Sequence, residues 1–174
     1  MAVDTMVLQW AIRRKGGSAD KIKHALYLFA EFEREHAQII VPSVVVAEFL
    51  IGVHPEAWPA VVASFTERFL VEPFDTKDTI MAATLWNYGK AHRAMGIPGA
   101  RVRLRSDTLI IATAVGHGAT EFYTDDDDCF AMAGKVMTAK RLPTIPPDLF
   151  FQVPGGAIDQ TQAEVQPGPE APQG

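Results

Sequence analysis

Acidic side chains in four separate parts of the chain are the residues whose types and settings could do chemistry. Asp4 follows a short apolar run, Glu48 lies inside a strongly apolar segment, and Asp107 precedes another one. Four consecutive aspartates occupy positions 125–128. Carboxylate oxygens are the ligands that hard cations such as Mg²⁺ and Mn²⁺ prefer. If the fold brings these acids together, they could bind such a metal ion.

Asp4 and Asp107 also have ordinary structural explanations. Asp4 falls at the end of a predicted strand and directly before a predicted helix, where aspartate is a good N-cap. We expect Asp107 to open a helix of apolar residues, and a carboxylate in the first turn of a helix is favourable by itself. For both residues, position alone leaves a structural role and a metal-binding role open.

Glu48 is the acid whose surroundings most demand a partner. The neighbouring residues from 44 to 51 are all apolar, which predicts a helix that is buried nearly all round. An unpaired buried carboxylate is costly or takes up a proton. We therefore expect a cation, an arginine or a polar cavity beside Glu48, unless its side chain reaches the rim of the protein.

The acidic run 125–128 follows a predicted strand and precedes Cys129. Four adjacent carboxylates repel one another, so such a run is usually a solvated loop or a cation site. A calcium loop of the EF-hand type fits poorly, because there is no glycine at its turn position and Val136 and Met137 cannot supply its closing glutamate.

The elements that must position these acids alternate along the chain. Short apolar runs alternate with longer helical patterns, which is typical of a parallel sheet covered by helices. An open sheet of this kind binds ligands at the carboxyl ends of its strands. The predicted strands are 2–4, 38–41, 69–73, 121–124 and 135–138. The predicted helices are 7–15, 20–36, 44–53, 57–68, 77–95 and 107–116.

Length and composition favour one domain. The chain has 174 residues, of which 48% are hydrophobic, enough for one good core. We expect a single domain over 1–152 and a disordered tail over 153–174, which is rich in Pro, Gly and Gln. The single cysteine excludes an internal disulfide, and the N-terminal apolar run is too short for a membrane span. A cytoplasmic location fits best.

Four segments of the chain, in order, resemble those of a known family. They are 3–8 with Asp4, 41–48 ending in Glu48, 106–114 with the sequence SDTLIIATA, and 117–124 followed by the acidic run and Phe130. This order resembles the PIN domain and, within that family, the VapC-like toxins of toxin–antitoxin pairs. The third segment is the closest match, and the resemblance covers about 1–144.

The resemblance implies a single three-layer α/β/α domain with a short central parallel sheet. It implies that Asp4, Glu48, Asp107 and Asp126 are catalytic and bind one or two Mg²⁺ or Mn²⁺ ions. The fourth acid of the family usually lies two residues after the threonine, which selects Asp126. Asp128 is the next choice of metal ligand.

The activity implied by the resemblance is that of a metal-dependent endoribonuclease, most plausibly the toxin of a toxin–antitoxin pair. Attack by water would leave a 5′-phosphate and a 3′-hydroxyl. The implied partners are RNA, an antitoxin protein and a second copy of the chain. The apolar helices 44–53 and 57–68 could supply the dimer surface. Two alternatives stay open: a PIN-fold scaffold without catalysis, and a related metal-dependent DNA nuclease or phosphatase.

Three arginines could attract RNA to a protein with a formal net charge of −5. Arg101, Arg103 and Arg105 lie in a predicted loop that leads to Asp107, and their alternation would place them along one side of an extended segment. They are candidates for contacts with RNA phosphates, against the alternative of a solvated loop. The five histidines show no metal-ligand spacing, so we expect them to be ordinary polar residues.

Overall fold

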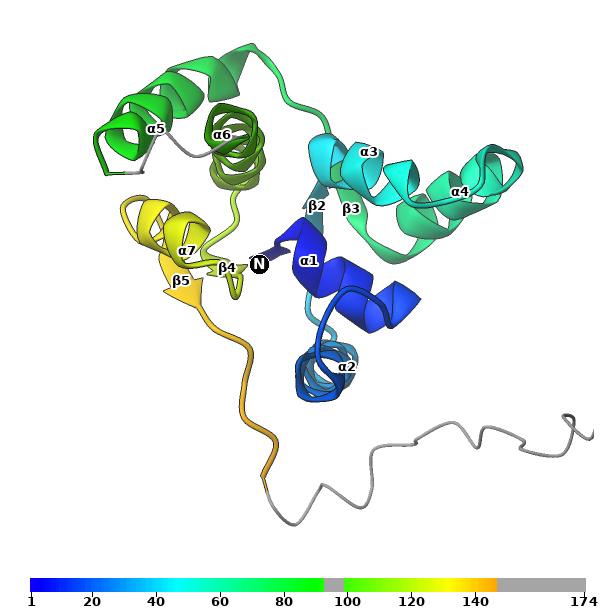
Figure 1. Cartoon of the computed structure of the whole chain (residues 1–174). Helices are drawn as coiled ribbons and strands as arrows, with labels where there is room; N and C mark the ends of the chain where they lie inside the picture. The colour runs from blue at the N-terminus through cyan, green and yellow to red at the C-terminus, as the bar shows by residue number, and fades with distance from the viewer. Residues whose placement is uncertain (93–98, 147–174) are drawn as a thin grey trace, which may run out of the picture.

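The central element of the protein is a five-stranded parallel sheet (Figure 1). The structure is a computed structural model and describes residues 1–92 and 99–146. The strand order is β3-β2-β1-β4-β5, so the first strand lies in the middle. The strands are β1 (Ala2–Val3), β2 (Ile40–Pro42), β3 (Leu70–Glu72), β4 (Glu121–Tyr123) and β5 (Thr138–Lys140).

Helices lie on both sides of this sheet, which gives the predicted three-layer arrangement. Figure 1 shows α5, α6 and α7 on one side and α1 and α2 on the other, with α3 and α4 beside the β2–β3 end. The α-helices are α1 (Thr5–Leu8), α2 (Ala19–Arg34), α3 (Ser43–Ile51), α4 (Trp58–Arg68), α5 (Thr79–His92), α6 (Ala100–Gly116) and α7 (Asp127–Ala133). A π-helical segment, η1 (Gln9–Arg13), follows α1 directly, and two 3-10 turns are η2 (Pro55–Ala57) and η3 (Thr76–Asp78).

The middle of the sheet is fully buried because it is short, apolar and covered on both faces. Val3, Val41 and Phe122, from three adjacent strands, have no exposed surface. Buried parallel strands of this kind read as continuous apolar runs, which is why the sequence locates them. Their register, with Val3 opposite Tyr123, brings the carboxyl ends of β1 and β4 side by side.

Two predicted elements are wrong in position. The last strand was expected at 135–138 but occupies Thr138–Lys140, because residues 127–133 form the unpredicted helix α7. The helix expected at 107–116 begins at Ala100, directly after Gly99 with its left-handed φ of 79°. The segment that carries the three arginines is therefore helical, not extended.

Two predictions concern parts of the chain outside the described residues. The disordered tail at 153–174 lies beyond residue 146, and the end of the helix predicted at 77–95 falls among residues 93–98. Among the described residues, no helix is both long and apolar enough to cross a bilayer.

Candidate active site

Asp4 is a buried carboxylate where β1 meets α1. Its side chain is 7% exposed. One oxygen accepts a hydrogen bond from the backbone N–H of Thr5 at 2.7 Å, so Asp4 has the N-cap role that was one of its two open alternatives. The other oxygen accepts from the hydroxyl of Thr124, at the end of β4, at 2.8 Å. The central strand pairing of the sheet thus determines where this carboxylate lies.

The surroundings of Asp4 disfavour the ionised form of its carboxyl group. The pKa of Asp4 is raised from 3.8 to about 7, mainly by burial and also by the charges of Asp107 and Asp126, against the opposing hydrogen bonds from Thr124 and Thr5. A Coulombic contribution from each of these acids means that the fold brings three predicted site residues together. Like charges in one place favour a proton or a cation between them.

Asp107 lies well inside α6, in a different position from the one predicted. The helix begins seven residues earlier, at Ala100, so the expected benefit from the first-turn helix dipole does not apply. Asp107 is half-buried. The structural explanation that competed with a metal-binding role is therefore removed for this residue.

Glu48 has hydrogen-bond partners, as expected for a charge in an apolar helix, and both partners are hydroxyl groups. The hydroxyl of Thr5 donates to Oε2, and the hydroxyl of Ser106 donates to Oε1. These donors directly follow Asp4 and directly precede Asp107 in the sequence. Glu48 is half-buried and is held beside the other acids through their sequence neighbours.

The four aspartates of the acidic run have different surroundings. Asp126 is the N-cap of α7 through a bond from the Cys129 N–H at 2.8 Å, and its own N–H donates to Thr124 Oγ1 at 3.1 Å. Asp125 pairs with Lys21 at 2.8 Å, and Asp127 pairs with Arg141.

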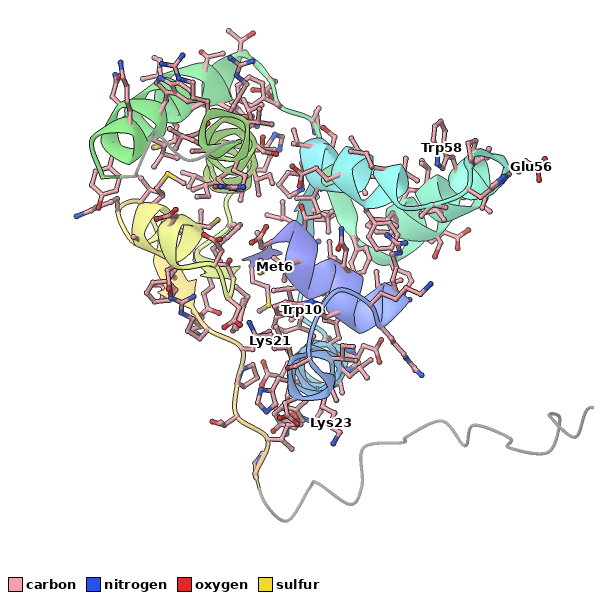
Figure 2. The ribbon with its side chains drawn as sticks, in the orientation of Figure 1. Met6, Trp10, Lys21, Lys23, Glu56 and Trp58 are labelled. Carbon is pink, nitrogen blue, oxygen red and sulfur yellow. The ribbon has the colours of Figure 1, made fainter. Side chains whose placement is uncertain are left out.

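Lys21 also lies over the ring of Trp10, and Figure 2 labels both side chains near α2. Asp128 is exposed in the first turn of α7. Within the run, Asp126 is the residue whose charge raises the pKa of Asp4.

The buried thiol of Cys129 lies in the same electrostatic environment. Burial raises its pKa well above the ordinary value, and the charges of Asp4, Asp107 and Asp126 raise it further. A neutral thiol is a poor nucleophile, so Cys129 is a packing residue in this site. The chemistry of the site must come from its oxygen atoms.

The ligand atoms of the predicted acids do not form a tight cluster. Among the residues that the structure describes, the group of three or more whose ligand atoms all lie within 4.8 Å of one another is Asp75, Asp78 and His117, away from the predicted acids. Mutual repulsion tends to hold carboxylates apart when no cation lies between them. The prediction that the histidines are ordinary polar residues stays a prediction, but the proximity of His117 to Asp75 and Asp78 was not visible in the sequence, because these residues are about 40 positions distant.

Because residues 101–105 are helical, the three arginines do not point to one side. On a helix, residues four apart share a face, so Arg103 lies on the face of Asp107, while Arg101 and Arg105 lie together on another. All three are exposed. The expected single row of arginines is wrong, and Arg103 is the one on the side of the candidate site.

Sequence reasoning missed the hydroxyl residues that orient the acids. Thr5, Ser106 and Thr124 each donate a side-chain hydrogen bond to Asp4 or Glu48. Each lies one or two residues from a predicted acid, and that adjacency was the available signal. The acceptor of each hydroxyl depends on packing between distant segments.

Comparison with protein-family models decides the family. The model of the PIN domain matches residues 1–135. The chain belongs to the PIN domain family. PIN domains are nucleases, hydrolases of phosphodiester bonds that generally use a divalent metal ion. A comparison with curated proteins gives no significant match.

Solved structures share the fold at low sequence identity. VapBC2 from Rickettsia felis, bound to a promoter DNA fragment, is 19% identical, with a TM-score of 0.53 over 82% of this chain and 98% of that one. DNA-bound VapBC from Salmonella typhimurium is 16% identical, with a TM-score of 0.54 over 82% and 97%. FitAcB from Neisseria gonorrhoeae is 19% identical, with a TM-score of 0.50 over 79% and 94%. The PIN domain of this chain therefore shares its fold with a chain of each of these structures.

Proposed function

We propose that this PIN domain is a Mg²⁺-dependent endoribonuclease that acts as the toxin of a toxin–antitoxin pair. The observation that carries the proposal is Asp4, a buried carboxylate whose pKa is raised to about 7 by burial and by the charges of Asp107 and Asp126. Such an arrangement is unfavourable without a cation and favourable with one. Perturbed acids of this kind concentrate at catalytic sites.

The donor set fits a hard divalent cation. Asp4, Asp107 and Asp126 would hold the ion, with Glu48 alongside, and all of their ligand atoms are carboxylate oxygens. Neither a thiolate nor an imidazole belongs to the set, which favours Mg²⁺ or Mn²⁺ over softer metals. When bound, such an ion lowers the pKa of a water molecule and stabilises the charge on a phosphodiester.

The residues of the candidate site would then have different roles in hydrolysis. Glu48, whose two oxygens accept hydrogen bonds from Thr5 and Ser106, would accept a proton from the attacking water. Hydrolysis would leave a 5′-phosphate and a 3′-hydroxyl. The buried hydroxyl of Thr124 donates to the Asp4 carboxylate and accepts from the backbone N–H of Asp126, so it would hold these two segments of the site together.

Arginines on α6 would contact the RNA backbone. Arg103 shares a helix face with Asp107 and would lie closest to the cleaved phosphate, while Arg101 and Arg105 would contact flanking phosphates. A guanidinium group binds a phosphate with two hydrogen bonds, which suits this role. The protein's net charge of −5 makes such local positive charge necessary.

The proposed protein partners are an antitoxin and a second copy of the chain. The similar solved structures include VapBC complexes, which supports an antitoxin partner. Apolar side chains on α3 and α4 support the dimer: Ile51 is 84% exposed and Trp58 is 42% exposed. Figure 2 shows Trp58 at the outer end of α4, well away from Trp10.

Cleavage assays on matched variants test the activity. Purified protein is incubated with structured RNA and, in parallel, with single-stranded DNA of the same sequence, in Mg²⁺ or in EDTA. We expect Mg²⁺-dependent cleavage of RNA, a loss of at least about a hundredfold in Asp107→Asn, and little cleavage of DNA. Equal cleavage by Asp107→Asn would contradict the assigned site, and binding of RNA without cleavage would favour the scaffold alternative.

A second pair of variants identifies the fourth ligand. Asp126→Asn should abolish cleavage, whereas Asp128→Asn, in the first turn of the same helix, should leave most of it. The opposite order would transfer the assignment to Asp128. For the toxin role, the protein encoded by a small upstream open reading frame should inhibit the cleavage when both are mixed.

A further inference from the structure

A second group of possible metal ligands lies where η3 meets the end of α6. Asp75, Asp78 and His117 each bring one ligand atom within 4.8 Å of the others. His117 follows Asp107 by ten residues, which is about 15 Å along a helix axis, so this cluster is separate from the candidate active site. Two further charged groups, Glu72 and Lys77, lie next to His117.

Asp78 is a fully buried carboxylate with an incomplete set of partners. Its exposed fraction is 0%, and Oδ2 accepts one hydrogen bond, from the Asp75 N–H at 3.0 Å. Oδ1 is buried and has no hydrogen-bond partner among the described residues. The other oxygen, Oδ2, lies 3.9 Å from Nε2 of the His117 ring. A buried carboxylate with so little compensation is costly unless a cation approaches it.

The ring of His117 is oriented as metal-binding imidazoles usually are. Its Nδ1 lies 2.9 Å from Glu72 Oε2, so an Nδ1–H donates to that carboxylate. Histidines that bind metals commonly donate their other ring N–H to a carboxylate, which determines the tautomer. Nε2 lies 3.1 Å from the Pro73 carbonyl, which accepts a hydrogen bond from it when Nε2 carries a proton, and 3.9 Å from Asp75 Oδ2. A metal ion bound to Nε2 would take the place of that proton. The Pro73 carbonyl, the Asp75 carboxylate and His117 Nε2 all have lone pairs that face the same point. A positive charge at that point, a proton or a metal ion, relieves their mutual repulsion.

We propose that Asp75, Asp78 and His117 bind a divalent cation of the zinc class, with the Pro73 carbonyl as a further oxygen ligand. An imidazole ligand favours zinc over magnesium, and a mixed nitrogen and oxygen set is usual for it. The ion links the segment after β3 to the end of α6, the helix that carries Asp107. Its role is structural, because the cluster lies apart from the acids assigned to hydrolysis.

Two other positive charges could occupy this position instead of a metal ion. The ammonium of Lys77 lies 3.6 Å from Asp75 Oδ2 and 3.3 Å from His117 Nδ1, but this side chain is half exposed and can move into solvent. A second proton on His117 would also satisfy Glu72 and Pro73 without any metal. The experiment must therefore separate a zinc site from a simple ion pair of protonated histidine with carboxylates.

Zinc binding to the full chain, stripped with EDTA and titrated by calorimetry, tests the proposal. We expect one zinc equivalent per chain at micromolar affinity, retained in Asp107→Asn and lost in His117→Gln. The matched control is His54→Gln, because His54 lies 3.9 Å from Glu56 as an exposed histidine–carboxylate pair. This control should bind zinc like the wild type. Loss of zinc in Asp107→Asn alone would place the ion in the candidate active site and overturn the proposal.

Two further measurements keep the test decisive if His117→Gln folds poorly. Asp75→Asn retains a residue that caps η3, yet should weaken zinc binding at least about tenfold, as should Glu72→Gln, which removes the acceptor of Nδ1–H. Zinc at about 100 times its Kd should raise the Tm of the wild type by roughly 5 °C, and that of Asp75→Asn by less. Absence of zinc binding by the wild type, or an unchanged affinity in both variants, would leave His117 as an ion-pair residue and overturn the proposal.

Discussion

The Asp4 carboxylate combines two requirements that oppose each other in the metal-free protein. It must be buried to lie at the junction of β1 and α1, and it must be ionised to bind a cation. Burial favours the neutral acid, and nearby Asp107 and Asp126 favour it further. The consequence is a proton that is bound more tightly in the folded state than in the unfolded state.

The first prediction concerns the pH dependence of stability without metal. The pKa of Asp4 is about 7 when folded and 3.8 when unfolded, so the stability that it contributes is complete below pH 3.8 and is lost as pH rises through 7. The loss should amount to at most about 4 kcal/mol, at about 1.4 kcal/mol per pKa unit. Urea unfolding in EDTA at several pH values measures it.

The control for this prediction is Asp4→Asn, which removes the titrating group. Its free energy of unfolding should fall less than that of the wild type between pH 4 and 7. Parallel curves for the two proteins would show that Asp4 does not titrate as argued. With saturating Mg²⁺, the difference should shrink, because the cation favours the ionised carboxylate.

The second prediction concerns the hydroxyl of Ser106. Ser106→Ala removes one of the two donors that orient Glu48, and we expect kcat for RNA cleavage to fall roughly 10- to 100-fold, as for other residues that orient site carboxylates. Ser106→Thr keeps the hydroxyl and should restore most of the activity. Single-turnover cleavage measures both variants, with Ser64→Ala on α4 as the control. A normal kcat in Ser106→Ala would remove Ser106 from the site.

Residue types alone were enough to identify the candidate acids, but not the hydroxyl residues that donate hydrogen bonds to them. Glu48 was identifiable because one charge in an apolar helix demands a partner. The identity of that partner was not, since Thr5 and Ser106 lie 43 and 58 residues from Glu48. Short-range patterns contain no information on such pairings. The choice of Asp126 within the acidic run rests on the family pattern and stays a prediction.

At the scale of elements, α6 shows where a periodic pattern misleads. The alternation of Arg101, Arg103 and Arg105 with Val102 and Leu104 suggested an extended loop. Yet the buried residues Ala100, Leu104, Thr108 and Ile111 recur at intervals of three and four, which is the spacing of one helix face. The helical spacing was present in the sequence, but it begins at Ala100, well before the apolar run that follows Asp107.

The third prediction follows from the faces of α6. Arg103→Ala should weaken RNA binding and lower the cleavage rate more than Arg101→Ala, because Arg103 lies on the face of Asp107. Each phosphate contact that is lost should reduce the slope of log affinity against log salt by about 0.7 for a single strand. Fluorescence anisotropy at several salt concentrations measures both variants. Equal effects of both substitutions would argue against the assigned face.

The fourth prediction concerns the end of α6 at Gly116. A Cβ added at this position would lie 1.7 Å from Asp78 Oδ1, so Gly116→Ala should destabilise the protein, by about 1–3 kcal/mol. Helix propensity alone would predict a gain of about 1 kcal/mol.

The discriminating control is Asp78→Ala. In that background the clash is absent, and Gly116→Ala should become neutral or stabilising, as measured by urea unfolding. Destabilisation by the same amount in both backgrounds would show that Asp78 is not the cause.

At the scale of the whole molecule, the sequence predicted the fold well because the fold depends on coarse patterns. Alternating strands and helices require a parallel sheet with helices on both faces, and the strand positions followed from short apolar runs. The misplaced strand β5 shows the limit. Residues 135–138 are apolar enough for a strand, but α7 ends only at Ala133 and pairing with β4 begins at Thr138.

The fifth prediction concerns assembly. If α3 and α4 supply a dimer surface, Ile51→Glu should convert a homodimer into a monomer, because Ile51 is 84% exposed on α3. Ile80→Glu is the matched control, with Ile80 79% exposed on α5. Sedimentation velocity on both variants and the wild type measures this. A dimer in Ile51→Glu, or a monomeric wild type, would exclude this surface.

The bond between Asp4 and Thr124 joins residues that are 120 positions apart. Asp4 is synthesised long before Thr124, yet its carboxylate has its place only when β4 has been made and has paired with β1. A chain that is released before β4 is complete therefore lacks an assembled site. The topology of the sheet makes the site depend on a late pairing, so truncated chains of a nuclease of this kind would be inactive.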